Sequence, residues 1–286
     1  NQNMKTRNEL LSSIAATIQD YRVDELPKPT PDHVNRWVKQ FDEAVQMPLL
    51  AEVDHVLDKT YFSKDYVTEF FAYQIANHPL VQGNPRAFWK RINFLNIQIH
   101  GHSQQEILAI FADILRDQCD LELDQCGAPD GYFFYLDDVL FSGSRIQTDL
   151  KNWVKNVAPA IASVHILVIG AHRLGEWFCE NGLKNVAIDA GKKITFDFWA
   201  GIRFENRKYK KEYSEVLWPC VIPVDPDLAA YMALEHKFPF EVRQAGGVLE
   251  HQVFSSEGGR QLIEREMLLA GVRIRAACQN PSPVIR

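Results

Sequence analysis

Cysteine is scarce in this chain, and its five cysteines are widely spaced with no CxxC pair. This excludes a disulfide framework or a zinc ribbon as the basis of the fold, and a reducing cytoplasm is the expected compartment. The first residues lack the apolar core of a signal peptide, so export is not expected. No apolar run approaches the roughly 20 residues that a membrane span needs, so we expect no contact with a membrane.

An excess of positive charge is lacking too, because the formal net charge is −6 over 286 residues. This argues against a protein that binds nucleic acid over its whole surface. One basic cluster, residues 203–211, interleaves cations with aromatic rings, on which bases can stack. It is a candidate contact for nucleic acid or a partner, and the alternative is a solvated charged loop. The basic residues are Arg203, Arg207, Lys208, Lys210 and Lys211.

The hydrophobic content of 46% is sufficient for one large domain or two small ones. Residues 1–91 are predicted to form a helical N-terminal extension. Thr30 before Pro31 is typical of a helix start, and a second helix is expected from Ser63. Asn84 and Pro85 then break the helical pattern.

Strand and helix patterns alternate over residues 92–204. Strands are predicted at residues 94–99, 132–136, 164–169 and 194–198. The first helix is predicted at Ser103, with Glu106 completing a capping box, the second near Ser142, and the third up to about Gly191. This alternation predicts an α/β core with a mainly parallel sheet, and ligands of such sheets bind outside the carboxyl ends of the strands.

Residues 205–286 are punctuated by prolines and predict a loop-rich, irregular C-terminal region packed on the α/β core. One late helix is expected over residues 257–271, with Gly271 as its stop.

The stretch FFYLDDVLFSGS places two acids after an apolar strand and a small hydroxyl-rich turn before a helix. Asp137 and Asp138 are hard to ionise side by side unless a cation or hydroxyl donors satisfy them, as a sugar diol with or without Mg²⁺ would. Ser142, Gly143 and Ser144 stand at a helix start suited to a phosphate. Together they predict a ribose-phosphate site. The plainer interpretation is that Asp138 caps a turn and the serines begin a helix.

These residues resemble the phosphoribosyl-pyrophosphate-binding motif of type I phosphoribosyltransferases. The resemblance implies that Asp137 and Asp138 hold the ribose hydroxyls, with Mg²⁺ reached indirectly through the ligand. It implies that Ser142, Gly143 and Ser144 hold the 5′-phosphate. The first turn of the α/β core would then receive pyrophosphate, and its residues are Gly101, His102, Ser103 and Gln104.

Two features depart from that family pattern. Arg145 stands in place of the motif's last Thr, which removes a hydroxyl and adds a cation that can pair with phosphate. Only twenty residues separate Arg116 from Asp137, too few for the mobile loop that covers the transition state in such enzymes. The resemblance implies transfer or hydrolysis at the anomeric carbon of phosphoribosyl pyrophosphate or a nucleotide, and without the loop we expect transfer to give way to hydrolysis or plain binding. The alternative is a non-catalytic module that senses nucleotides or binds a partner.

The helical extension, GHSQ, SGSR and EGGR at residues 257–260 together resemble phosphoribosyltransferase-like proteins of bacterial conflict operons, including some beside retron reverse transcriptases. That resemblance implies an antiphage effector and a reverse transcriptase or another operon partner.

Rival interpretations concern a few of the same residues. Tyr135 to Asp138 also resembles the YxDD box of reverse transcriptases, which binds two Mg²⁺ ions at a hairpin tip. His100 and His102 have the spacing of a metal pair but lack a third ligand nearby. His172 and Arg173 follow the third strand, where they would meet a substrate base or phosphate or form a solvated loop.

Overall fold

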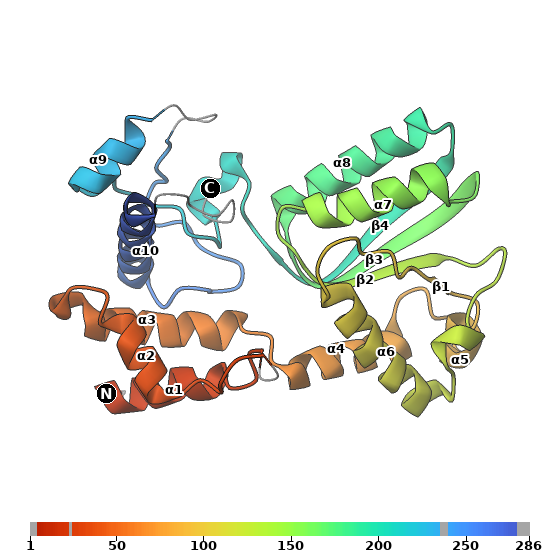
Figure 1. Cartoon of the computed structure of the whole chain (residues 1–286), viewed down its shortest axis with the longest axis horizontal. Coiled ribbons are helices and arrows are strands. Elements are labelled where there is room, and N and C mark those ends of the chain that lie inside the picture. The colour runs from red at the N-terminus through yellow and green to blue at the C-terminus, as the bar shows by residue number, and fades with distance from the viewer. Residues whose placement is uncertain (1–4, 23–24, 235–239, 279–286) are drawn as a thin grey trace. The chain divides into compact units, whose positions relative to one another are not determined.

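The computed structural model describes residues 5–22, 25–234 and 240–278, and the contacts of the chain divide it into two units (Figure 1). The α/β unit is Lys64–Asn206. The helical unit combines Asn1–Ser63 with Arg207–Arg286. None of the helices in the described ranges is both long enough and apolar enough to cross a bilayer.

A four-stranded sheet forms the centre of the α/β unit, as the alternating pattern predicted. Its strands are β1 (Asn93–Phe94), β2 (Phe133–Leu140), β3 (Ile161–His172) and β4 (Lys193–Phe204). They lie in the order of the sequence, and every neighbouring pair is parallel. β3 is buried along most of its length because it has a neighbour on each side and helices over the faces.

The strand bounds differ from the predicted ones. β1 spans two residues where six were expected. The Leu95 N–H still donates to the Phe134 carbonyl, but the N–H groups of Ile97 and Gln98 donate to Gln104 Oε1 at 2.9 Å each. β2 runs on to Leu140, past the two acids, and β3 and β4 reach 12 residues each.

Helices cover both faces of this sheet (Figure 1). On one face lie α7 (Ser144–Asn156) and α8 (Arg173–Asp189), whose apolar residues share one core with Tyr135 and Ile166. The other face carries α6 (Ser103–Cys119), where Phe111 packs edge-on against Trp89 and meets Phe94. A short helical turn, η1 (Leu123–Gln125), follows α6.

Two further helices lie within the predicted N-terminal extension but belong to the α/β unit, and only the first of them was expected. These are α4 (Lys64–Asn77), close to the predicted start at Ser63, and α5 (Pro85–Trp89). Asn84 and Pro85 begin α5 rather than a loop, because Asn84 Oδ1 accepts the Ala87 N–H at 3.0 Å. The first division of the chain thus falls at residue 64 instead of 92, since α4 and α5 contribute rings to the α6 face of the sheet.

The helical unit is formed by segments from both ends of the chain. Its helices are α1 (Arg7–Thr17), α2 (Pro31–Val38), α3 (Glu43–Thr60), the short turn η2 (Lys208–Tyr213), α9 (Pro226–Met232) and α10 (Glu257–Ala277). Thr30 caps α2 as predicted. The predicted stop at Gly271 is wrong: α10 continues six residues further, because a glycine inside a helix costs only about 1 kcal/mol. Whether residues 205–286 pack on the α/β core stays a prediction.

The EGGR segment is part of a buried charge network in the helical unit. Arg243 forms ion pairs with Glu257 at 2.9 Å and Glu264 at 2.8 Å, and Arg260 pairs with Glu264 at 2.9 Å. A Cβ on Gly259 would lie 2.0 Å from the Glu52 carboxylate. The charges and the glycine at the start of α10 therefore have a structural explanation.

Candidate functional site

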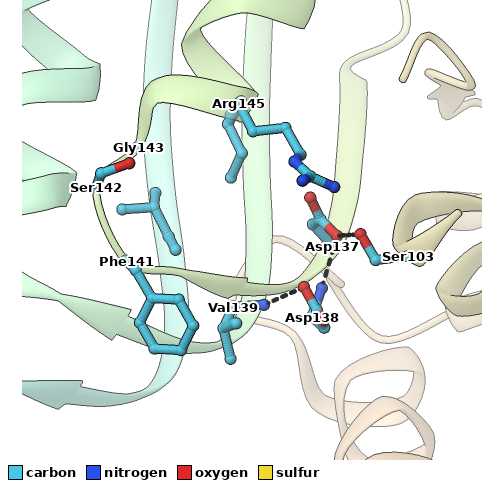
Figure 2. Close-up of a pocket in the computed structure, with 10 residues that line it drawn as sticks. Ser103, Asp137, Asp138, Val139, Phe141, Ser142, Gly143 and Arg145 are labelled. Carbon is cyan, nitrogen blue, oxygen red and sulfur yellow. Dashed lines mark hydrogen bonds between the residues drawn. The ribbon is translucent and has the colours of Figure 1, made fainter. Parts of the chain in front are cut away.

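A cavity of about 350 Å³ lies at the carboxyl end of β2 (Figure 2). It is lined by β2, by the turn that leads into α7 and by the start of α6. Among the predicted site residues, the cavity brings together Ser103, Asp137, Asp138, Ser142, Gly143 and Arg145. The remaining lining residues are Val139, Leu140, Phe141 and Ile146.

Asp137 is the buried acid of the pair, with 2% of its surface exposed. Its Oδ1 atom accepts a hydrogen bond from Ser103 Oγ at 2.8 Å and another from the Asp138 backbone N–H at 3.0 Å. Burial, and after it the neighbouring Asp138 charge, raise the pKa of Asp137 to about 7, although the Ser103 hydrogen bond opposes the rise. The strand therefore presents a carboxyl group that is near its titration point at neutral pH.

The two acids do not end the strand, as the sequence suggested, but lie within its last four residues. Because neighbouring residues of a strand alternate between the faces of the sheet, Asp138 is directed away from Asp137 and is only half-buried. Its Oδ1 atom accepts the Val139 N–H at 2.7 Å. The pair thus consists of one enclosed and one accessible carboxyl group.

The turn between β2 and α7 depends on two glycines. Gly143 has φ +75° and precedes the first residue of α7. A Cβ there would lie 2.6 Å from the Gly175 carbonyl oxygen and 2.7 Å from Cys179 Cβ, and a Cβ on Gly175 would lie 1.9 Å from the Phe141 carbonyl oxygen. The turn therefore packs backbone against backbone on the start of α8. Gly175 is a site-forming residue that the sequence did not indicate.

Residues 97–103 form the second turn at the cavity, before α6. Ser103 does not cap this helix as predicted: it is the first helical residue, and its hydroxyl donates to Asp137 instead. Gln104 is fully buried and holds the turn through its side-chain oxygen, so its role is structural here. His102 is exposed, and neither His102 nor Gly101 lines the cavity itself.

Arg145 connects the two turns. Its side chain leaves the start of α7 and extends to Gly101, whose Cβ, if present, would lie 2.4 Å from Arg145 Nη1. Figure 2 shows the guanidinium above Asp137 and Ser103. The cation that replaces the motif's last Thr is thus directed across the cavity rather than toward the serines of its own turn.

Tyr135 and Asp149 support the site through buried hydrogen bonds, and the sequence patterns did not indicate this role for either residue. The Tyr135 hydroxyl donates to Asp149 Oδ2 at 2.9 Å and lies 3.5 Å from Asp137 Oδ2. Asp149 Oδ1 accepts the Ile99 N–H at 3.1 Å, so this buried carboxylate links α7 to the turn before α6. Asp149 could have been noticed in the sequence, because an acid on the apolar stripe of a predicted helix is unusual.

Other predicted residues lie outside the cavity. Ser144 is exposed at the start of α7 and does not line it. His172 ends β3 and packs edge-on against Phe141, which does line it, at a ring distance of 4.9 Å; burial lowers the pKa of this histidine. Arg203, the first residue of the basic cluster, is paired with Glu176 at 2.8 Å and belongs to the α/β unit, whereas residues 207–211 belong to the helical unit.

The connection between α6 and β2 lies at the opposite edge of the sheet from the cavity. Gly127 N–H donates to the Lys90 carbonyl at 2.9 Å, and Asn93 Nδ2 donates to the Ala128 carbonyl at 2.9 Å. These contacts hold residues 127–128 beside the start of β1, at the amino ends of the strands. This connection therefore does not cover the cavity.

The polymerase interpretation of YLDD is wrong. It requires the acids at a hairpin tip, but β2 pairs in parallel with β1 and β3 and is followed by a helix. No group of three or more metal-binding side chains occurs in the described part of the chain. Mg²⁺ fits this site only in the mode in which one or two carboxylates and the ligand's own phosphates hold it.

A parallel α/β sheet with an acidic pair and a glycine turn at the carboxyl end of one strand is the arrangement of phosphoribosyltransferase-like proteins. The family described as PRTase-CE matches residues 34–280, and the chain belongs to this phosphoribosyltransferase-like family. The match extends over both units. Comparison with curated proteins gave no match.

Proposed function

We propose that this protein binds a ligand carrying ribose 5-phosphate, either phosphoribosyl pyrophosphate or a nucleotide, and transfers or hydrolyses the group at the anomeric carbon. The observation that carries the proposal is the single cavity shared by the acidic pair, the Ser142–Gly143 turn and Arg145. Carboxylates suit the ribose hydroxyls, and a helix start with a nearby cation suits the phosphate.

Each group has a distinct part in this proposal. Asp137 and Asp138 orient the ribose ring, and the half-buried Asp138 is the acid that an incoming ligand reaches first. Ser142 and Gly143 offer a hydroxyl and backbone N–H groups at the start of α7. Asp137 and Asp138 would hold Mg²⁺ through the ligand, and the ion would supply positive charge for a departing pyrophosphate. No covalent nucleophile is required.

A second candidate is a binding module without catalysis. The observation that favours it is the position of residues 127–128 at the amino edge of the sheet, since a site open to water shields an oxocarbenium-like transition state poorly. The same openness favours hydrolysis over transfer if the protein is an enzyme.

Calorimetric titration with phosphoribosyl pyrophosphate, NAD and nucleoside monophosphates in Mg²⁺ tests the proposal. The test variant is Asp137→Asn/Asp138→Asn, and Asp117→Asn, an exposed acid on α6, is the matched control. We expect the double variant to lose at least about tenfold in affinity, because hydrogen bonds to charged groups contribute roughly 1.5–3 kcal/mol each. Equal affinity of the two variants for every ligand would contradict the proposal. Product analysis of the same samples separates enzyme from binding module.

Resemblance and composition support three further proposals. These are an antiphage role, a reverse transcriptase as partner, and a nucleic-acid contact through residues 203–211. Purification of the chain together with the products of neighbouring genes tests the partner directly, and loss of the reverse transcriptase from such a preparation would count against it.

A further inference from the structure

Arg145 differs from Arg203, another cation near the carboxyl edge of the sheet, in having no carboxylate partner. Arg203, for comparison, makes two hydrogen bonds to Glu176 at 2.8 and 3.1 Å. No carboxylate of the described residues lies within ion-pair distance of Arg145. It is also the one cationic side chain among the described residues that line the cavity. Its charge is therefore available to a ligand.

The position of this charge is set by Gly101. The turn before α6 has φ +92° at Gly101, a conformation that favours glycine, and the missing side chain leaves room for the guanidinium. The contact of 2.4 Å to a hypothetical Cβ means that any other residue there would push Arg145 away. The cation consequently lies at the turn before α6 although its backbone belongs to the first turn of α7.

The two turns therefore offer two separate places for anionic groups. The turn before α7 provides Ser142, Gly143 and a helix start, and the turn before α6 provides the Arg145 guanidinium beside Gly101. Ser103 and Asp137, which are joined by a hydrogen bond, lie below the guanidinium in Figure 2. A ligand with a single phosphate would occupy the first place and leave the guanidinium without a partner.

We propose that Arg145 is a specificity-determining residue: it selects ligands that carry a second anionic group, such as a diphosphate, at the Gly101 turn and supplies protein charge there in addition to that of a divalent cation. This inference rests on the proposed function, because it assumes that a ribose 5-phosphate occupies the cavity.

The test measures affinity for two probes, phosphoribosyl pyrophosphate and ribose 5-phosphate, by calorimetry in EDTA, so that only the protein's own charge acts. Arg145→Gln removes the charge and keeps a polar side chain that can donate a hydrogen bond. Lys151→Gln removes an exposed cation from the same helix and is the matched control. Circular dichroism confirms that each variant is folded.

We expect Arg145→Gln to weaken binding of phosphoribosyl pyrophosphate by about tenfold or more and binding of ribose 5-phosphate by less than about threefold, since charge-assisted hydrogen bonds are the strong ones. Lys151→Gln should change neither affinity. Equal losses for the two probes, or equal affinity of the wild-type protein for both, would overturn the inference.

Two further outcomes separate this inference from the proposed function. If both probes bind in Mg²⁺ but neither binds in EDTA, the guanidinium does not supply the charge, and the inference alone fails. If neither probe binds in Mg²⁺ or in EDTA, the proposed ribose-phosphate site itself is refuted.

Discussion

Tyr135 places one hydroxyl group between two buried carboxylates, those of Asp137 and Asp149. The hydroxyl can donate a hydrogen bond to either carboxylate, and burial together with the negative charges around it raises the pKa of Tyr135, so the hydroxyl stays protonated. The family motif requires only an apolar residue at this strand position, which the ring of Tyr135 satisfies.

Tyr135→Phe keeps that ring and removes the donor. We expect a loss of about 1–3 kcal/mol in the free energy of unfolding, because two buried acceptors lose a partner. Urea denaturation measures it. Tyr132→Phe removes a hydroxyl from a residue that is 41% exposed and should change stability by less than about 0.5 kcal/mol. Equal losses in the two variants would mean that the buried Tyr135 hydroxyl contributes no more to stability than the exposed Tyr132 hydroxyl.

At the same scale, the sequence indicated the chemistry of the site but not its supports. The acidic pair and the glycine turn were visible because they are consecutive in the chain. Asp149 and Gly175 were not, because their importance comes from contacts with residues that are 14 and 34 positions away, respectively: the first with Tyr135 and the second with Phe141. The pattern within one element can mark an unusual residue, such as an acid on an apolar stripe, but it does not identify the distant partner of that residue.

At the scale of elements, the turn between β2 and α7 has its position fixed by α8. Gly143→Ala should destabilise the protein in two ways. The φ of +75° costs about 1 kcal/mol for an alanine, and the overlap with the Gly175 carbonyl adds roughly 1–3 kcal/mol.

Gly191→Ala is the matched control for this turn, because Gly191 has φ +66° with open space around the position of a Cβ. Gly191→Ala should lower the free energy of unfolding by only about 1 kcal/mol, which is the backbone cost of a positive φ for alanine. Thermal or urea unfolding of both variants measures the difference. If the two variants were equally stable, the close packing of the turn on α8 would not hold.

The types of most elements in the α/β unit were predictable from the sequence, and several bounds were not. α8 ends within two residues of the predicted Gly191. β4 is more than twice as long as predicted, because pairing with β3 continues to Phe204 beyond the apolar run. β1 is shorter than predicted, because the side chain of Gln104 takes the backbone donors that a longer strand would use.

At the scale of the α/β unit as a whole, two buried histidines contribute to the response to acid. His78 and His165 lie among aromatic rings on the α6 face, and burial lowers the pKa of both, that of His78 to about 4. Their ordinary pKa near 6.5 in the unfolded chain means that unfolding takes up protons below this pH. Stability due to these histidines is thus present above about pH 6.5 and is lost as the pH falls toward 4.

Asp137 acts in the opposite direction over a similar range. Its pKa is raised to about 7 in the folded state, so its contribution is lost as the pH rises from about 4 to 7. The change contributed by one histidine must therefore be measured as a difference between variants.

His78→Gln should flatten the loss of stability between pH 6.5 and 4 by up to about 1.4 kcal/mol per pH unit relative to the wild-type protein. Urea unfolding at a series of pH values measures it. His100→Gln, at an exposed turn residue, is the control and should leave the slope unchanged. An unchanged slope in His78→Gln would show that this imidazole does not resist protonation.

The sequence by itself determined the alternation of strands and helices, the helix start at Thr30, and the acids and glycine that characterise the candidate site. These follow from the local periodicity and turn chemistry of a few consecutive residues. Only the tertiary structure decided that Arg145 lies against Gly101 and that Asp149 meets both Tyr135 and Ile99. It also assigned α4 and α5 to the α/β unit. These are contacts between segments far apart in the chain, and they depend on how side chains fill space once the sheet has formed.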